Sequence, residues 1–244
     1  MLRQRTIQRK VEATGLGLHS GKLVKLIIFP AQVDIGIVFR RTDLIPTKDI
    51  NIYNASVTNT NLASTISENG IEISTVEHFI AAVSGLGIDN ILVEVNGSEL
   101  PIMDGSASTF VYLLKTAGIK EQSKSKKFIE IIKSVCVSNG DKWAKLDPYF
   151  GFKLDFVVDF SHPILNNKNR RVLIDFEKTI FSEEIARART FGFISDVDFL
   201  REKNLALGGG LDNALVLDQH KILNKKGLRQ PNELVMHKAL DAIG

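Results

Sequence analysis

The amino-acid sequence predicts an α+β protein. Short runs of apolar, β-branched and aromatic residues bounded by glycine-rich turns are typical of strands, whereas other stretches show the three-to-four-residue apolar spacing of helices. The same order, strands first and a helix afterwards, recurs in the second half of the chain. This repeated order favours two similar α+β domains.

The first half of the chain contains the clearest patterns. Strand-like runs flank a glycine-rich segment at residues 15–21. Residues 90–95, Asn-Ile-Leu-Val-Glu-Val, are apolar along most of their length, which is typical of a strand buried on both faces. The expected elements are strands at 7–13, 23–29 and 90–95, a helix at 75–84 ending near Gly85 and Gly87, a turn at 101–106 and a helix at 110–117.

A polar segment divides the chain. Residues 120–127, Lys-Glu-Gln-Ser-Lys-Ser-Lys-Lys, contain no apolar side chain and are predicted to be a linker. We therefore expect an N-terminal domain at residues 1–124 and a C-terminal domain at 125–244. In the second domain we expect strands at 128–137, 152–160 and 171–176, a turn at 161–163 and a helix around 182–188.

A glycine-rich insert interrupts the second domain at about residues 190–217. It is predicted to form a strand, a short helix and a second strand, with Gly208, Gly209 and Gly210 before the second strand. Such small residues suit the lining of a narrow apolar channel, and a glycine-rich surface loop fits the same pattern.

Composition excludes several classes of function. The formal net charge of +3 is too small to indicate nucleic-acid binding, although it suits an anionic small substrate if the basic residues cluster. The single cysteine, Cys136, excludes an internal disulfide framework and fits a reducing cytoplasm. The sequence shows neither a signal-peptide pattern nor an apolar run long enough to span a bilayer. We expect a cytoplasmic protein without a transmembrane segment.

Two histidine-bearing helical segments provide a candidate metal site. His237 and Asp241 are four residues apart and leave one face of a helix, and His78 lies on the other predicted helix. Two imidazoles and one carboxylate match the three protein ligands of a catalytic zinc site, which keeps its fourth position for water. Ferrous iron accepts the same ligands. The small residues Ala81, Ala82 and Gly85 beside His78 allow a close approach of another backbone or of a ligand.

Each of these residues also has a simpler interpretation. His78 can be a core histidine, and His237 with Asp241 can form a surface pair that contributes little to stability. Glu77 can act as a general base beside His78, or it can belong to a Ser74-x-x-Glu77 capping box, whose glutamate bonds back to the backbone of the cap. The residues alone leave these alternatives open.

Four longer motifs carry a resemblance to a known family. They are Ile73-Ser74-Thr75-Val76-Glu77-His78, Pro101-Ile102-Met103-Asp104-Gly105-Ser106, Ala188-Arg189-Thr190-Phe191-Gly192-Phe193 and His237-Lys238-Ala239-Leu240-Asp241-Ala242-Ile243-Gly244. They resemble the motifs of UDP-3-O-acyl-N-acetylglucosamine deacetylase, the zinc amidase that commits bacteria to lipid A synthesis. The similarity runs from Gln8 to the last residue. It implies two α+β domains with the active site between them, each carrying an insert.

The resemblance also implies a role for each site residue. His78, His237 and Asp241 would hold one Zn²⁺ ion per chain. Glu77 would be the general base that activates water, and Thr190 would help to stabilise the oxyanion. Asp159 and Phe160 would contact the nucleotide, and Phe191 and Lys238 would contact the substrate, Lys238 at its anionic portion. The residues implied for the channel of the 3-O-acyl chain are Ile194, Val197, Ala206, Gly209, Gly210, Ala214 and Val216.

The implied reaction removes the N-acetyl group from UDP-3-O-(3-hydroxyacyl)-N-acetylglucosamine. The implied partner is this UDP-linked acylated amino sugar, and we expect a monomer that binds no nucleic acid. The family continues beyond the residue that matches Gly244, so the resemblance identifies the chain as C-terminally truncated. Because Asp241 lies near the last residue and helix ends fray, we expect weak zinc binding.

Two alternatives belong to other functional classes. A truncated remnant would bind the nucleotide sugar or the acyl chain without turnover. An RNA-binding α+β domain is disfavoured by the modest charge and by the lack of basic clusters interleaved with aromatic residues. Metal content distinguishes the readings, since an RNA-binding domain should hold no metal and a remnant should hold it loosely.

Overall fold

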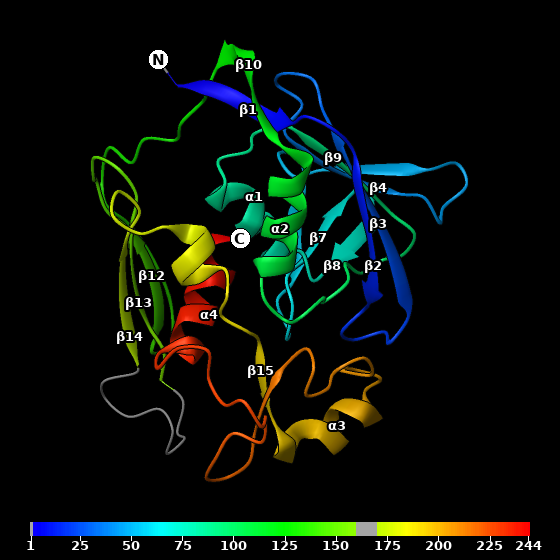
Figure 1. The fold of residues 1–244 in the computed structure, drawn as a ribbon. Helices are drawn as coiled ribbons and strands as arrows, with labels where there is room; N and C mark the ends of the chain where they lie inside the picture. The colour runs from blue at the N-terminus through cyan, green and yellow to red at the C-terminus, as the bar shows by residue number, and fades with distance from the viewer. Residues whose placement is uncertain (1, 160–169) are drawn as a thin grey trace.

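The computed structural model describes residues 2–159 and 170–244 and confirms the α+β class (Figure 1). Its largest sheet has the strand order β2-β3-β9-β4-β5, in which β4 and β9 are parallel and the other neighbouring pairs are antiparallel. The strands are β2 (Val11–Leu16), β3 (Leu23–Pro30), β4 (Ile37–Arg41), β5 (Lys48–Asn51) and β9 (Ile91–Val95).

Two helices cover one face of this sheet, α1 (Glu77–Gly85) and α2 (Ser108–Ala117). Phe79 of α1 is fully buried and meets Phe39 of β4 and Phe110 of α2 edge to face, with ring centroids 5.9 and 5.4 Å away. Aromatic pairs prefer this geometry, and large buried rings dominate the energetics of a core. The packing fixes α1 against the sheet.

The strand at residues 91–95 lies in the middle of the sheet, as its apolar run predicted. Ile91, Val93 and Val95 are fully buried, and β9 pairs with β3 on one side and β4 on the other. A three-stranded antiparallel sheet precedes α1 and leads directly into it. Its strands are β6 (Ser56–Asn59), β7 (Thr65–Glu68) and β8 (Ile71–Ser74).

The predicted linker at residues 120–127 is wrong. Ile119–Ser125 forms β10, which pairs antiparallel with β1 (Arg3–Ile7). The side-chain amide of Asn90 donates a hydrogen bond to Gln122 Oε1, so this polar side chain of β10 binds another part of the protein. The single strand expected at residues 7–13 is also wrong. Ile7 ends β1 and Val11 begins β2, and these two strands belong to different sheets.

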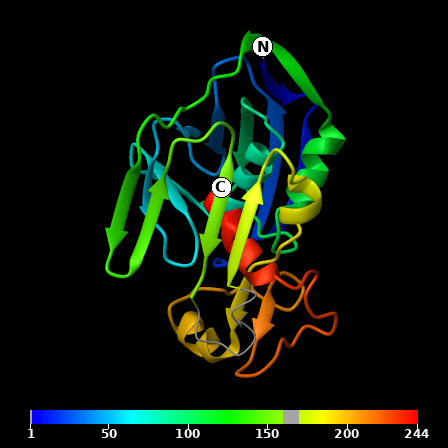
Figure 2. The same cartoon turned by 90° about the vertical axis from the view of Figure 1, so that its left-hand side faces the viewer.

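The second half contains two antiparallel hairpins (Figure 2). The strands of the first are β11 (Val135–Asn139) and β12 (Lys142–Leu146), and those of the second are β13 (Lys153–Val157) and β14 (Arg171–Asp175), which pack against α4 (Glu233–Ile243). The expected strand at 128–137 therefore begins only at Val135. The predicted turn at 161–163 and the end of the strand at Phe160 lie outside the described residues.

The helix expected around residues 182–188 is a single π-helical turn, Phe181–Ile185. It ends early because the backbone beyond it has partners elsewhere. The N–H of Arg189 donates to the Glu233 carboxylate at 3.1 Å, and the N–H of Thr190 donates to the Gly105 carbonyl at 2.7 Å. A continuing helix would use those N–H groups internally.

The insert has the predicted order of strand, helix and strand. Strands β15 (Phe191–Phe193) and β16 (Leu215–Leu217) are parallel neighbours, and a 3₁₀ turn (Ile194–Asp196) and α3 (Val197–Glu202) lie between them in the chain. None of the described helices combines the length and the apolar character that crossing a membrane requires. The domain boundary near residue 124 remains a prediction.

Candidate metal centre

The two predicted histidine helices pack against each other. The end of α4 lies beside the start of α1 (Figure 1). A Cβ at Gly244 would lie 2.0 Å from the Glu77 carbonyl oxygen and 3.0 Å from the Ala81 backbone nitrogen. Ala81 and Ala82 are themselves fully buried. The close backbone approach that these alanines predicted is therefore present.

This approach brings His78, His237 and Asp241 together. One potential ligand atom from each residue lies within 4.8 Å of the others. Asp241 Oδ1 is 3.5 Å from His78 Nε2 and 3.3 Å from His237 Nε2, and the two imidazole rings meet edge to face with centroids 4.9 Å apart. His78 and His237 are 3% and 1% exposed, so neither is a surface residue.

The donor set fits a metal ion. His237 Nδ1 lies 3.0 Å from the Ala188 carbonyl, and donation of its proton there leaves the Nε2 lone pair facing the group. Burial lowers the pKa of His237 to about 3, so its imidazole is neutral at physiological pH. Asp241 Oδ1 is buried without a hydrogen-bond partner among the described residues. A cation would satisfy this orphaned oxygen together with the imidazole nitrogens.

Asp241 is held in its ionised form. Burial opposes ionisation of this carboxyl, but the neighbouring histidines and Lys238 outweigh it and lower its pKa. Lys238 Nζ donates to Asp241 Oδ2 at 2.8 Å and lies 5.5 Å from the centre of the Phe191 ring. The Lys238 ammonium therefore binds the carboxylate oxygen that does not face the histidines. Its predicted contact with the substrate remains a prediction.

Glu77 is a buried carboxyl that directly precedes His78 in the chain. Its Oε2 accepts the backbone N–H of Ser64 at 3.0 Å, and the helix has no side-chain cap. The capping-box interpretation with Ser74 is therefore wrong, because the carboxylate bonds to a segment outside its own helix. Burial raises the pKa of Glu77, and the charge of Asp241 adds to that rise. A raised carboxyl pKa brings the group closer to the range in which it exchanges protons near neutrality.

A buried ion pair supports the second histidine. Glu233, fully buried in the first turn of α4, accepts bonds from Arg189 Nε at 2.8 Å and Nη2 at 3.1 Å. Arg189 follows Ala188, whose carbonyl accepts from His237. Sequence reasoning missed Glu233, although the signal was present, since Glu233, His237 and Asp241 follow one another at intervals of four on one helix.

The motif at residues 101–106 supports Thr190, which directly precedes β15. A Cβ at Gly105, which has a φ of +79°, would lie 1.9 Å from the Asn213 carbonyl oxygen. Asp104 accepts hydrogen bonds from the hydroxyl of Ser106 and from Arg229, at 2.9 Å in both cases. The motif therefore joins the start of α2 to the insert and to the loop before α4. The role of the Thr190 hydroxyl remains a prediction.

The predicted substrate contacts lie on several elements. Asp159 is exposed and pairs with Arg170 at 2.8 Å, and Phe160 lies outside the described residues. Phe191 is near the metal group, with its ring centroid 6.5 Å from that of His237. The predicted channel residues all belong to the insert, and the channel itself remains a prediction. They are Ile194, Val197, Ala206, Gly209, Gly210, Ala214 and Val216.

An α+β protein that gathers two histidines, one aspartate and an adjacent buried glutamate between two helices belongs to the class of candidate metallohydrolases. Residues 4–244 match the family UDP-3-O-acyl N-acetylglycosamine deacetylase, and the chain belongs to this family. It is similar to proteins named UDP-3-O-acyl-N-acetylglucosamine deacetylase from Alcanivorax borkumensis (53% identical), Photobacterium profundum (52%) and Vibrio vulnificus (52%). The matches cover 100% of this chain and 80%, 81% and 80% of the relatives, in that order.

Proposed function

We propose that this chain is a zinc-dependent amidase that removes the N-acetyl group from UDP-3-O-(3-hydroxyacyl)-N-acetylglucosamine, the step that commits bacteria to lipid A synthesis. The observation that carries the proposal is the convergence of His78, His237 and Asp241 within 4.8 Å, in a chain of this family. The proposal places the reaction in the bacterial cytoplasm, a reducing compartment in which a free thiol such as the exposed Cys136 persists.

The ligand set offers zinc two imidazole nitrogens and one carboxylate oxygen. When bound, zinc supplies a Lewis acid that polarises a carbonyl and lowers the pKa of water towards neutrality. Ferrous iron is the alternative metal for the same donors. The Ala188 carbonyl fixes the His237 tautomer whose Nε2 can bind a metal, and the Lys238 ammonium favours the ionised form of Asp241.

Glu77 is the proton acceptor in this proposal. As the water oxygen adds to the amide carbonyl, one of its protons passes to the Glu77 carboxylate. Glu77 returns this proton to the amide nitrogen as the C–N bond breaks, which gives acetic acid and the free amine. The bond from the Ser64 N–H occupies Oε2 and leaves Oε1 for the proton. Thr190, whose backbone is fixed by bonds to Gly105 and Leu215, would offer its hydroxyl to the oxyanion.

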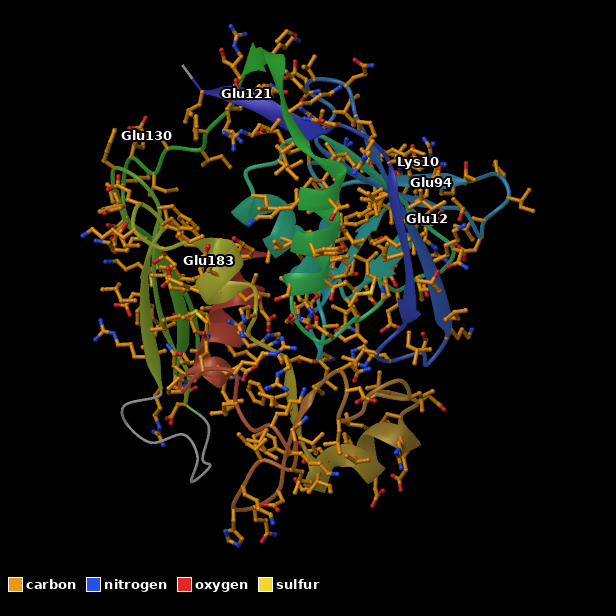
Figure 3. The ribbon with its side chains drawn as sticks, in the orientation of Figure 1. Lys10, Glu12, Glu94, Glu121, Glu130 and Glu183 are labelled. Atoms are coloured by element: carbon orange, nitrogen blue, oxygen red, sulfur yellow. The ribbon has the colours of Figure 1, made fainter. Side chains whose placement is uncertain are left out.

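The experiment that tests the proposal compares Glu77→Gln with wild type in metal content and in turnover of the acylated nucleotide sugar. The amide keeps an acceptor for the Ser64 N–H but cannot take a proton. We expect unchanged zinc stoichiometry and a loss of kcat of about 10²- to 10⁴-fold. Glu12→Gln is the matched control, because Glu12 is an exposed residue of the edge strand β2 (Figure 3).

The outcomes separate the candidate functions. Full turnover by Glu77→Gln would remove Glu77 as the base. If the wild type binds zinc and substrate but shows no turnover, the alternative function, binding without hydrolysis, replaces the hydrolase. A folded wild-type chain that holds no metal would contradict the metal centre, because every class of donor needed for it is present.

A further inference from the structure

Glu99 is a buried carboxylate outside the metal group. It is 4% exposed, and it accepts hydrogen bonds from the backbone N–H of His19 at 2.7 Å, the N–H of Ser20 at 3.0 Å and the hydroxyl of Thr75 at 3.3 Å. Burying a carboxylate is costly unless such donors compensate for the lost water. Glu99 therefore connects two segments that are distant in the sequence, the turn at residues 17–21 and the entry to α1.

On one side, Glu99 holds the residue that directs the chain into α1. Thr75 has a φ of +57°, in the left-handed region that β-branched residues rarely occupy. Its hydroxyl bonds to Glu99, and the preceding residue, Ser74, bonds through its N–H and carbonyl to Ser98 and Leu100 on the Glu99 segment. Glu77 and His78 follow within three residues, so the direction of this helix depends on a strained residue that Glu99 restrains.

On the other side, Glu99 holds the turn on which the insert rests. A Cβ at Gly17 would lie 2.4 Å from Glu99 Oε2, so a side chain at residue 17 would displace the carboxylate. The same turn accepts backbone bonds from the insert. Leu207 N–H donates to the His19 carbonyl at 3.2 Å, and Gly208 N–H donates to the Leu18 carbonyl at 2.9 Å.

The contact between turn and insert is tight. A Cβ at Gly208 would lie 2.3 Å from the Gly17 carbonyl oxygen, and the Cβ of Leu207 is 3.1 Å from the position of a Cβ at Gly21. The two backbones therefore touch without intervening side chains. A displacement of the turn would move residues 206–210 of the insert by a similar amount.

We propose that Glu99 is a positioning residue that sets the distance between the insert segment at residues 206–210 and the start of α1, and thereby decides which acyl-chain lengths the site accepts. The hydrogen bonds of Glu99 come from His19, Ser20 and Thr75, none of which is a proposed metal ligand, so Glu99 acts through Thr75 and the turn. The role in acyl-chain selection rests on the proposed function, whereas the structural coupling does not.

The first test measures the coupling without turnover. Hydrogen–deuterium exchange of the Leu207 and Gly208 amides is compared in wild type, Glu99→Gln and Gly208→Ala. In Glu99→Gln an amide NH₂ replaces one acceptor oxygen opposite the backbone N–H groups, and in Gly208→Ala the new Cβ disrupts the same contact from the insert side. We expect the two amides to exchange at least about tenfold faster in Glu99→Gln, and the Leu207 amide likewise in Gly208→Ala, with zinc content unchanged.

The second test measures acyl-chain selection. The ratio of kcat/KM for the preferred acyl chain to that for a chain several carbons shorter should fall about tenfold in both variants, because a displaced insert buries fewer CH₂ groups of the longer chain. Glu12→Gln and Gly97→Ala are the controls, since Glu12 is exposed and a Cβ at Gly97 meets no atom within 4 Å.

The results discriminate between the two proposals. Unchanged exchange at Leu207 and Gly208 in Glu99→Gln would overturn the positioning role of Glu99, whatever the turnover. Equal loss of kcat for all chain lengths would overturn the role in selection. If wild type shows no turnover, the proposed function fails, and faster exchange in the variants still supports the coupling through Glu99.

Discussion

The helix pair that carries the metal ligands and the β11–β12 hairpin are opposite extremes of packing in this molecule. Every residue of α1 from Glu77 to Val83 is buried, whereas every residue of β11 and β12 is exposed. The hairpin nonetheless carries large apolar side chains, and Trp143 is 70% exposed. A two-stranded hairpin alone is marginally stable in water, whereas a buried helix is fixed on all sides.

This contrast in burial shows which packing gives the metal site its precision. A metal centre needs ligands held within a fraction of an ångström, and the packing of α1 and α4 supplies this because glycine and alanine let the backbones touch. The buried pair of Arg189 and Glu233 adds hydrogen bonds that leave few alternative arrangements. Matched substitutions at buried and at exposed positions should therefore differ strongly in effect.

The largest difference should come from removing one partner of an ion pair. Glu233→Ala leaves the Arg189 guanidinium buried without its partner, and this should reduce the free energy of unfolding by about 3–5 kcal/mol. The variant should also lose zinc, because Ala188, which orients His237, precedes Arg189. The measurements are chemical denaturation and metal analysis.

The matched control for Glu233→Ala is Asp155→Ala, which removes the partner of Arg171 on the exposed face of the β13–β14 hairpin. We expect no measurable change in stability or zinc content, since exposed pairs contribute little. Similar losses of stability in the two variants would contradict the contrast between buried and exposed ion pairs.

Local patterns in the sequence predicted the parts of the site that depend on local geometry. His237 and Asp241 share a helix face because they are four residues apart, and the strand–helix–strand order of the insert follows from its own residues. The structure adds what is not local. Neither the bond from Ser64 to Glu77 nor the pairing of Arg189 with Glu233 is encoded by short-range spacing.

Long-range pairing also explains the main error in the fold. Residues 120–125 are polar and give no strand periodicity, yet they form a strand because β1, near the start of the chain, offers its backbone. Backbone hydrogen bonds are independent of side-chain type, so composition alone assigned this segment to a linker. The capping-box interpretation of Glu77 failed for a related reason, since a distant N–H group occupied its carboxylate.

A smaller difference in the free energy of unfolding should separate a buried from an exposed position when one methylene group is deleted. Ile73→Val at a fully buried position on β8 should lower the free energy of unfolding by about 0.5–1.5 kcal/mol, because a cavity remains. Ile129→Val, at a position that is 92% exposed before the β11–β12 hairpin, should leave it within about 0.5 kcal/mol of wild type. Urea denaturation of both variants measures this. Equal decreases in the free energy of unfolding in the two variants would show that residue 129 is covered in solution.

The smallest expected difference concerns two carboxylates that each pair with an arginine. The Arg41 guanidinium lowers the pKa of Asp43, and the Arg171 guanidinium lowers the pKa of Asp155. A carboxyl whose pKa is lower in the folded state stabilises the fold only while it is ionised. This stabilisation is complete above the ordinary pKa of about 4 and is lost as the pH falls through the lower folded value.

Asn variants of both residues test the sign and the environment. The stability difference between wild type and Asp43→Asn should be largest near neutral pH and should shrink as the pH falls below about 4. It should persist in about 1 M salt, because Arg41 is only 9% exposed and also donates to the Glu72 carbonyl. The difference for Asp155→Asn should disappear in that salt, because both partners are in water. Urea denaturation at several pH values measures both, and a salt-resistant contribution from Asp155 would mean that the β13–β14 surface is shielded from solvent.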